Sequence, residues 1–418
     1  MNTLNVSWLL ISICLAFLST FGTILFYVSS RENYKMHKMI SLCLISIATA
    51  SIIWVLWGWS LASGPSDIFG IISNPFEEFL LNGKVFSNDI IYTSVPASFQ
   101  TVGGVLGITF QMVLLMLAIV IIACCLGGRQ KFSSWILFCI LWITLVFCPI
   151  SHIINTGFLS NGGAIIHLLG TSFYDFAGAS KVQLTSVTTV AVILVLLRRK
   201  EIDETIDGSN QNQVAEPSSK DQLCALVSIF ALMIGYFGII MGATLNADSN
   251  AGYGLIITIL IACSSMVGWI SIQQFLIKKF SIFSIAHGVL CGLILSTACA
   301  GVVSPTQALF LGLLSGIICN IIVRTVRKKI SHTVGWDVVS IHFPACVIGL
   351  LAVGFLEPEK GLLVGGSFNQ FLAQILGISF VIIYVSVFSA LISLFVNFIL
   401  GWHERWIHRE NETQKLVS

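Results

Sequence analysis

Long apolar segments recur along this chain, and they constrain its fold more than any other feature of the sequence. A bilayer-crossing helix needs about 20 mostly apolar residues. Apolar residues make up 56% of the 418 residues and charged residues only 10%, against about 25% in an average soluble domain. The sequence therefore predicts an all-α polytopic membrane protein with about eleven transmembrane helices. We expect these helices at about 7–29, 38–62, 98–126, 134–155, 176–197, 221–244, 252–276, 282–303, 307–325, 337–356 and 371–400.

The charged residues in the loops alternate in sign along the chain. Lysine and arginine follow the odd-numbered windows, whereas aspartate and glutamate dominate the loops between them. Cytoplasmic loops are enriched in Lys and Arg, so we expect a multi-pass cell-membrane protein with its N-terminus outside and its C-terminus in the cytoplasm. We expect the first window to be retained as a span, because no basic residue precedes it and no small-residue cleavage site follows it. The net charge of +2 gives no sign of a nucleic-acid partner.

One long polar stretch, rich in Gly, Ser, Asn and Gln, divides the apolar windows into two sets of five plus one extra. Two five-span units in tandem have opposite topology, which is the inverted-repeat plan of many transporters, with the site between the repeats near the midplane. We expect a transmembrane domain over 1–400 and a cytoplasmic tail over 401–418. Within it we place a first repeat at about 7–197, a cytoplasmic linker at about 198–220, a second repeat at about 221–356 and an extra helix at about 371–400.

Two stretches place polar side chains at equivalent positions of the two units. Asp175 begins the fifth window with Gln183 deeper in it, and Asp337 begins the tenth with His342 deeper. A charged group in hydrocarbon costs about 2.5–3.5 kcal/mol on insertion scales, so such groups usually line a path enclosed by protein. We expect both aspartates to cap helix starts, with cation attraction at the outer entrance as a second role.

The deeper residues of these stretches allow more than one interpretation. His342 either lines a pore or is tied into a helix–helix hydrogen bond. Gln183 can hydrogen-bond His342 or ammonia, but it cannot take up or release a proton near neutral pH. Lys181 lies two residues before Gln183, about 200° around an α-helix, so we expect it to face away from the pore lining, toward a contact with another protomer. The alternatives are that it snorkels outward or pairs with a carboxylate, or that it faces the vestibule, where it would repel ammonium.

Together with other ordered motifs, these stretches resemble the ammonium transporter/methylammonium permease/Rhesus family over nearly the whole length of the chain. The motifs are Leu25-Phe-Tyr27, Trp54-Val-Leu-Trp-Gly-Trp, Phe110-Gln111, Pro149-Ile-Ser-His152, Asp175-Phe-Ala-Gly178 and Asp337-Val338 followed by His342.

The resemblance implies an eleven-helix protomer, a homotrimer and one narrow hydrophobic pore per protomer. It also implies two histidines facing each other at mid-pore and two stacked phenylalanines that gate the vestibule. This chain departs from that pattern, because Gln183 stands at one histidine position. Phe110 is the outer phenylalanine that remains, while Leu114 and a position near Ile239 replace the gate pair.

The expected function is passage of ammonium or ammonia across the bilayer, without a proton relay between two histidines. Two rival interpretations are a non-conducting ammonium sensor and a channel for another small uncharged solute. An enzyme is the weakest alternative, since no nucleotide-binding or GxSxG motif stands out. We expect no cofactor and no metal. The resemblance also allows a cytoplasmic regulatory protein as a partner of the tail.

Overall fold

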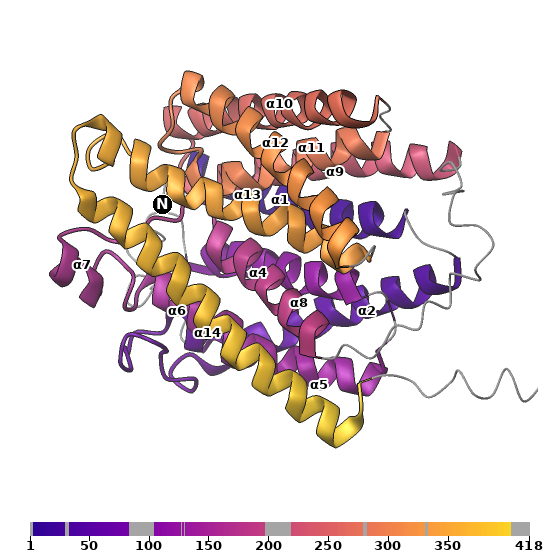
Figure 1. Ribbon diagram of the computed structural model, residues 1–418. Coiled ribbons are helices and arrows are strands. Elements are labelled where there is room, and N and C mark those ends of the chain that lie inside the picture. Colours follow the sequence, from indigo (N-terminus) through magenta and orange to yellow (C-terminus); the bar gives the residue numbers. More distant parts are fainter. Residues whose placement is uncertain are drawn as a thin grey trace, which may run out of the picture.

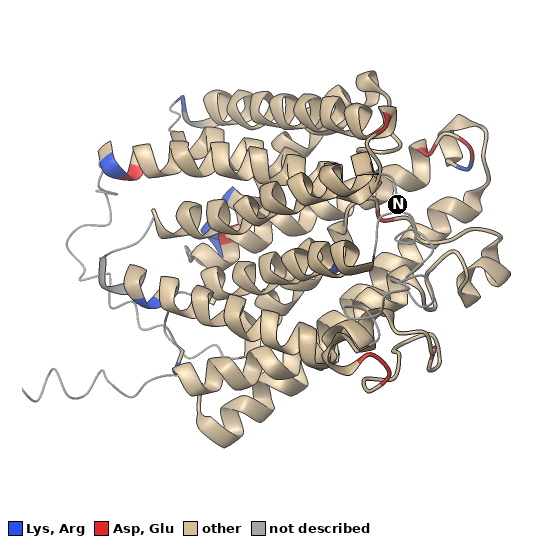
Figure 2. Cartoon of the chain, turned by 180° about the vertical axis from the view of Figure 1, so that it is seen from behind, with Lys and Arg blue, Asp and Glu red and all other residues tan. Residues whose placement is uncertain are grey.

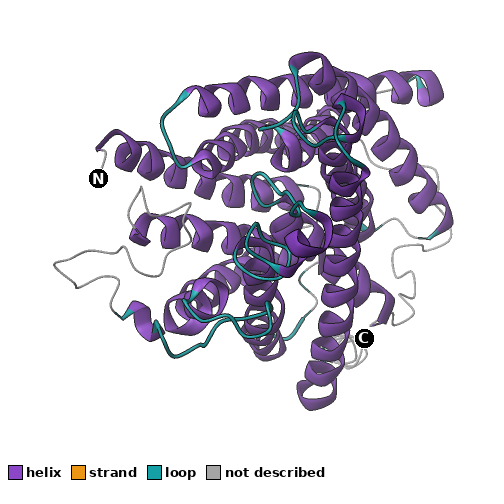
Figure 3. Cartoon of the chain, turned by 90° about the vertical axis from the view of Figure 1, so that its left-hand side faces the viewer, coloured by secondary structure: helices purple, strands orange, loops and turns teal. Residues whose placement is uncertain are grey.

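The computed structural model describes residues 3–29, 33–82, 104–126, 128, 130–196, 219–278, 282–330 and 333–402, apart from the side chains of 33–35 and 277. Most of the linker and of the tail expected from the sequence lies outside these residues. Figure 1 shows a bundle of long helices, and Figure 3 shows only helices and loops in the part described. The α-helices are α1 (Thr3–Val28), α2 (Asn33–Ile53), α3 (Trp59–Ser63), α4 (Gly104–Leu126), α5 (Phe132–Trp142), α6 (Cys148–Asn155), α7 (Ala164–Leu169), α8 (Thr185–Leu196), α9 (Ser219–Thr244), α10 (Ser249–Ile277), α11 (Ile282–Cys299), α12 (Pro305–Lys329), α13 (Val334–Leu356) and α14 (Phe368–Leu400).

Three of the long helices contain a π-helical turn, a wider turn that often occurs at functional sites. These turns are η1 (Trp54–Gly58), η4 (Ile143–Phe147) and η5 (Ala179–Leu184). The second span is therefore α2–η1–α3, the fourth is α5–η4–α6, and the fifth is η5–α8. Short 3₁₀ turns, η2 (Phe79–Leu81) and η6 (Leu362–Val364), lie in the loops.

Eleven helical segments in the described chain are long and apolar enough to cross a membrane. Each overlaps one of the eleven windows expected from the sequence, so the predicted fold class is confirmed. The segments differ in how deeply they lie within the protein: 78% of the apolar window is buried in α4 and in α11, against 33% in α14. The third and eighth spans are therefore central, whereas the eleventh lies on the outside of the bundle.

Spans at equivalent positions in the two halves make equivalent contacts. The first span of each half packs against the other, as α1 against α9. Within the halves, α4 packs on α8 as α11 packs on α13, and α8 in turn contacts α13. This correspondence agrees with an inverted repeat, and it brings the fifth and tenth spans together at the centre. The exact repeat boundaries remain predictions.

Glycines allow α1 and α9 to approach closely. A Cβ atom added at Gly235 would overlap the backbone of Ser19, and one at Gly238 would overlap the backbone of Ala16. Small residues at helix contacts allow this approach within a bilayer. The two first spans therefore pack backbone to backbone.

Charged side chains gather at the two ends of the bundle. Figure 2 shows most Lys and Arg residues of the described chain at one end and most Asp and Glu residues at the other. The outer helix α14 runs obliquely across several other spans (Figure 1). It has 33 residues, which at 1.5 Å per residue exceeds the roughly 30 Å thickness of a bilayer core, so a tilted position accommodates its length.

Candidate functional site

Four polar side chains from four different spans meet at the centre of the bundle. The Nε2 atom of His342 on α13 lies 3.0 Å from the hydroxyl oxygen of Tyr27 on α1. Its Nδ1 atom lies 2.8 Å from Oε1 of Gln183 on η5. The amide nitrogen of Gln183 donates to the hydroxyl of Tyr236 on α9 at 2.8 Å. All four residues are at most 4% exposed, so the cluster is enclosed by protein.

The chemistry of these groups fixes the direction of the hydrogen bonds. The amide oxygen of Gln183 only accepts, so Nδ1 of His342 carries the proton that lies between them. In a neutral imidazole Nε2 then accepts, and the hydroxyl of Tyr27 donates to it. The bonds therefore run in one direction, from Tyr27 through His342 and Gln183 to Tyr236. Gln183 has no proton to exchange near neutral pH, so proton transfer by tautomer exchange stops at its amide.

The turn that carries Gln183 is organised by Asp175 and Gly178. The carboxylate of Asp175 accepts from the backbone nitrogens of Ala179 at 2.7 Å and of Ser180 at 2.9 Å, and also from the Ser180 hydroxyl. Gly178 has a φ of 86°, which glycine adopts without steric cost. The expected capping role of Asp175 is thus confirmed. Burial raises the pKa of this carboxyl, while the hydrogen bond from Ser180 and the charge of Lys181 act in the opposite direction.

Asp337 differs from Asp175 in both position and partner, and two expectations for it were wrong. Its carboxylate accepts two hydrogen bonds from Arg327 on α12, at 2.7 and 2.8 Å, rather than capping α13. Five crossings separate the start of the fifth span from the start of the tenth, so the two starts lie at opposite ends of the bundle. Asp337 therefore cannot share an outer entrance with Asp175.

Lys181 also lies elsewhere than the sequence predicts. It is 6% exposed, and its Nζ donates to Oε1 of Gln111 on α4 at 2.9 Å. It therefore points into the bundle and not toward another protomer. The prediction assumed that the face opposite Gln183 looks outward, but 72% of the fifth span's apolar window is buried, so both faces of η5 lie inside the bundle.

The residues at the gate positions are buried and apolar. Phe110 and Leu114 on α4 and Ile239 on α9 are each 2% exposed. Phe110 lies against α9, since a Cβ atom added at Gly242 would overlap its ring. Gly242 is three residues beyond Ile239, about one helical turn. The structure thus brings Phe110 next to the α9 segment that carries Ile239.

Sequence reasoning missed several partners of these residues. Tyr27 and Tyr236 occur inside apolar runs, where a buried tyrosine hydroxyl usually needs a partner, and that signal could have identified them. His152 is likewise paired, with Asp67 through Nε2 at 3.1 Å and with the hydroxyl of Thr156 through Nδ1 at 3.1 Å. It belongs to a polar contact with a loop and not to the central cluster.

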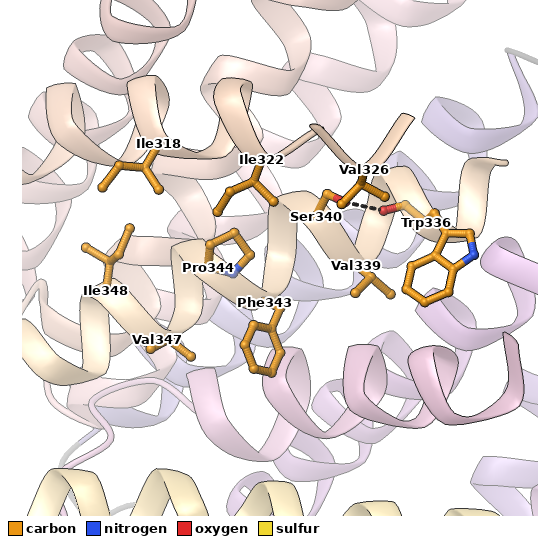
Figure 4. Close-up of a pocket in the computed structure, with 10 residues that line it drawn as sticks. All are labelled: Ile318, Ile322, Val326, Trp336, Val339, Ser340, Phe343, Pro344, Val347 and Ile348. Carbon is orange, nitrogen blue, oxygen red and sulfur yellow. Dashed lines mark hydrogen bonds between the residues drawn. The ribbon is translucent and has the colours of Figure 1, made fainter. Parts of the chain in front are cut away.

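A separate apolar hollow of about 340 Å³ lies between α12 and α13. Figure 4 shows Phe343 and Pro344 of α13 facing this hollow together with Ile318 and Ile322 of α12. His342 and Gln183 are not among its ten lining residues. The hollow is therefore distinct from the central cluster, although it uses the next two residues of the same helix.

Comparisons with known proteins agree on one family. The profile of the Ammonium Transporter Family matches residues 7–415. An ammonium transporter of Aquifex aeolicus is 29% identical over 96% of this chain and 89% of its own length. A putative ammonium transporter of Methanothermobacter thermautotrophicus is 28% identical over 100% and 96%. The fold is similar to Saccharomyces cerevisiae Mep2, with a TM-score of 0.84, 20% identity and coverage of 98% and 90%. It is also similar to a solved sensor Amt protein, with a TM-score of 0.80, 20% identity and coverage of 96% and 95%.

Proposed function

Because this multi-pass membrane protein belongs to the ammonium transporter family, we propose that it passes ammonium nitrogen across the bilayer as uncharged ammonia. The route runs through the centre of each protomer, between the fifth and tenth spans. Leu114 and Ile239 supply apolar walls to this route and Phe110 lies at its edge. Apolar walls cannot replace the hydration of a cation, whereas neutral ammonia is transferred at a far lower cost.

The observation that carries the proposal is the contact between Gln183 and His342. A neutral imidazole offers one donor and one acceptor, and an amide offers both, so ammonia can take the place of either partner during passage. In the structure the two side chains form a direct hydrogen bond of 2.8 Å, which closes the route at this point. Passage then requires this bond to open and re-form around the ammonia molecule.

Flux into liposomes tests the proposal. Purified protein is reconstituted with a pH-sensitive dye inside, and an ammonium gradient is applied. Entry of ammonia makes the interior more alkaline, so we expect faster alkalinisation than in protein-free liposomes, without a transport current. Parallel gradients of methylamine and carbon dioxide establish which small uncharged solutes share the route. A rate equal to that of protein-free liposomes would exclude transport.

Replacing Gln183→His provides the sharpest variant. A histidine there can exchange protons with His342 through tautomers, which glutamine cannot. We expect this variant to acquire an ammonium-dependent transport current on a supported membrane, while wild type gives none. Gln183→Asn is the control, because it keeps the amide but shortens the side chain. An unchanged current in Gln183→His would show that the position has no part in transport.

A sensor is the second candidate, and the filled centre favours it. Both ring nitrogens of His342 are engaged by protein groups, and one protein of similar fold is a sensor Amt protein. Growth separates the candidates: a cell that lacks ammonium uptake should grow on limiting ammonium when it expresses a transporter. Expression without growth, together with ammonium-dependent stabilisation of the purified protein, supports the sensor.

The assembly and orientation belong to the same proposal. We place the N-terminus outside and the C-terminus in the cytoplasm. This orientation is supported by the basic residues that gather at one end of the helix bundle, among them Lys328 and Lys329 at the end of α12. A homotrimer is proposed from the family, and a cytoplasmic regulatory protein is the proposed partner of the tail.

A further inference from the structure

Lys181 places a primary ammonium group inside the bundle, beside the proposed route. Its Nζ lies 2.9 Å from Oε1 of Gln111, and both residues are at most 6% exposed. Gln111 follows Phe110 and precedes Leu114 by three residues on α4. The ammonium group therefore contacts the stretch of α4 between these two apolar side chains.

The backbone of η5 holds this side chain on the Asp175 side of Gln183. A Cβ atom added at Gly178 would lie 2.8 Å from Cε and 3.2 Å from Cγ of Lys181, so the lysine folds back over Gly178. The charges of Lys181 and Asp175 attract each other. The ammonium group thus lies on the Asp175 side of η5, against Gln111 of α4.

Nearby acceptors are already in use. Both carboxylate oxygens of Asp175 accept hydrogen bonds within their own turn, and the amide oxygen of Gln111 accepts from Lys181. An incoming ammonium ion carries the same charge and the same kind of N–H donors as the lysine side chain. It therefore meets a like charge, and nearby acceptors that already receive hydrogen bonds from Lys181 or from the turn itself.

We propose that Lys181 is a tethered cation that takes the place of a bound ammonium ion and excludes monovalent cations from the entry to the Gln183–His342 pair. Only an uncharged solute such as ammonia then passes. The lysine is a specificity-determining residue of the route, and this inference rests on the proposed function.

Replacing Lys181→Met tests it, since methionine is unbranched like lysine but carries no charge. Lys181→Arg is the matched control that retains a cation, and Lys181→Gln is a second neutral variant in case methionine does not fold there. The readout is thermal stabilisation of the purified protein by methylammonium chloride at pH 6, against sodium chloride at equal ionic strength. A ligand that binds only the folded state stabilises it by RT ln(1 + [L]/Kd), so the shift in unfolding temperature with ligand concentration reports the affinity.

We expect methylammonium to stabilise the two neutral variants and to leave wild type and Lys181→Arg unchanged. The affinity for methylammonium should be about tenfold or more higher in the neutral variants than in wild type. Equal responses in wild type and Lys181→Met, or stabilisation of wild type by methylammonium, would overturn the inference. Failure of the proposed function is distinguished by wild-type ammonia flux, which is measured separately and does not enter the comparison of binding.

Discussion

At the scale of the residue, the contact between His342 and Gln183 joins a side chain that can exchange protons to one that cannot near neutral pH. The pairing of Gln183 with His342 was among the alternatives raised by their equivalent positions, and the structure brings them into contact. Asp337 was misplaced because two aspartates in similar motifs were assigned to one entrance, although an odd number of crossings separates them. Lys181 was misplaced because hydropathy does not show that the fifth span is buried on both faces, so the side opposite Gln183 also faces protein.

The cap at Asp175 gives a prediction at this scale. Asp175→Ala removes the acceptor for two backbone nitrogens and one hydroxyl, and we expect it to lower the free energy of unfolding by about 1–3 kcal/mol. Asp175→Asn keeps one acceptor oxygen, so its free energy of unfolding should lie between those of wild type and Asp175→Ala. Glu359→Ala, at an exposed loop position, is the control. Unfolding in mixed micelles measures the difference, and an Asp175→Ala protein as stable as wild type contradicts the capping role.

At the scale of the element, hydropathy alone located the eleven spans of the described chain, because a helix in lipid must be apolar over its whole length. Shorter elements follow no such rule. The π turns η1 and η4 and the short helix α7 were not expected, because these elements depend on packing and on loop contacts and not on a periodic pattern. The close contact of α1 with α9 was also unexpected, although its glycines are visible in the sequence.

The contact of α1 with α9 gives a prediction at the scale of the element. Gly235→Leu places a side chain where the Ser19 backbone lies, so we expect it to separate the two helices and to cost at least about 1–3 kcal/mol of stability, as overpacking does. Gly252→Ala on α10 is the control, since its added Cβ atom meets no atom within 4 Å. Thermal unfolding in detergent and the yield of monodisperse protein measure both. Equal behaviour of the two variants would contradict close packing at Gly235.

At the scale of the whole molecule, equivalent helix contacts in the two halves explain why the functional side chains meet at the centre. The fifth and tenth spans are equivalent members of the two units and meet at the centre, so residues at equivalent positions in them come together. The outer surface of the bundle is apolar, with Phe230 57% exposed on α9 and Phe275 80% exposed on α10. Such surfaces face lipid or another protomer, and hydropathy does not distinguish the two environments.

Association of protomers is the prediction at this scale. We expect the protein in mild detergent to have a protein mass of about three times 45.5 kDa by light scattering coupled to size exclusion. Chemical cross-linking in native membranes should give dimers and trimers, with the trimer as the largest cross-linked product. The protein mass of a single protomer at micromolar concentration, in several detergents, would contradict the trimer.

The row of bonds from Tyr27 to Tyr236 has one more consequence. A proton moving along such a row would have to pass through every group in it, and the amide of Gln183 neither takes up nor releases a proton near neutral pH. The imidazole of His342 can exchange its protons with a neighbouring group. The amide of Gln183 cannot, and it is held in place by hydrogen bonds to His342 and Tyr236. The interior is thus polar and yet electrically insulating, so a cell could keep its membrane potential while this protein is present in large numbers.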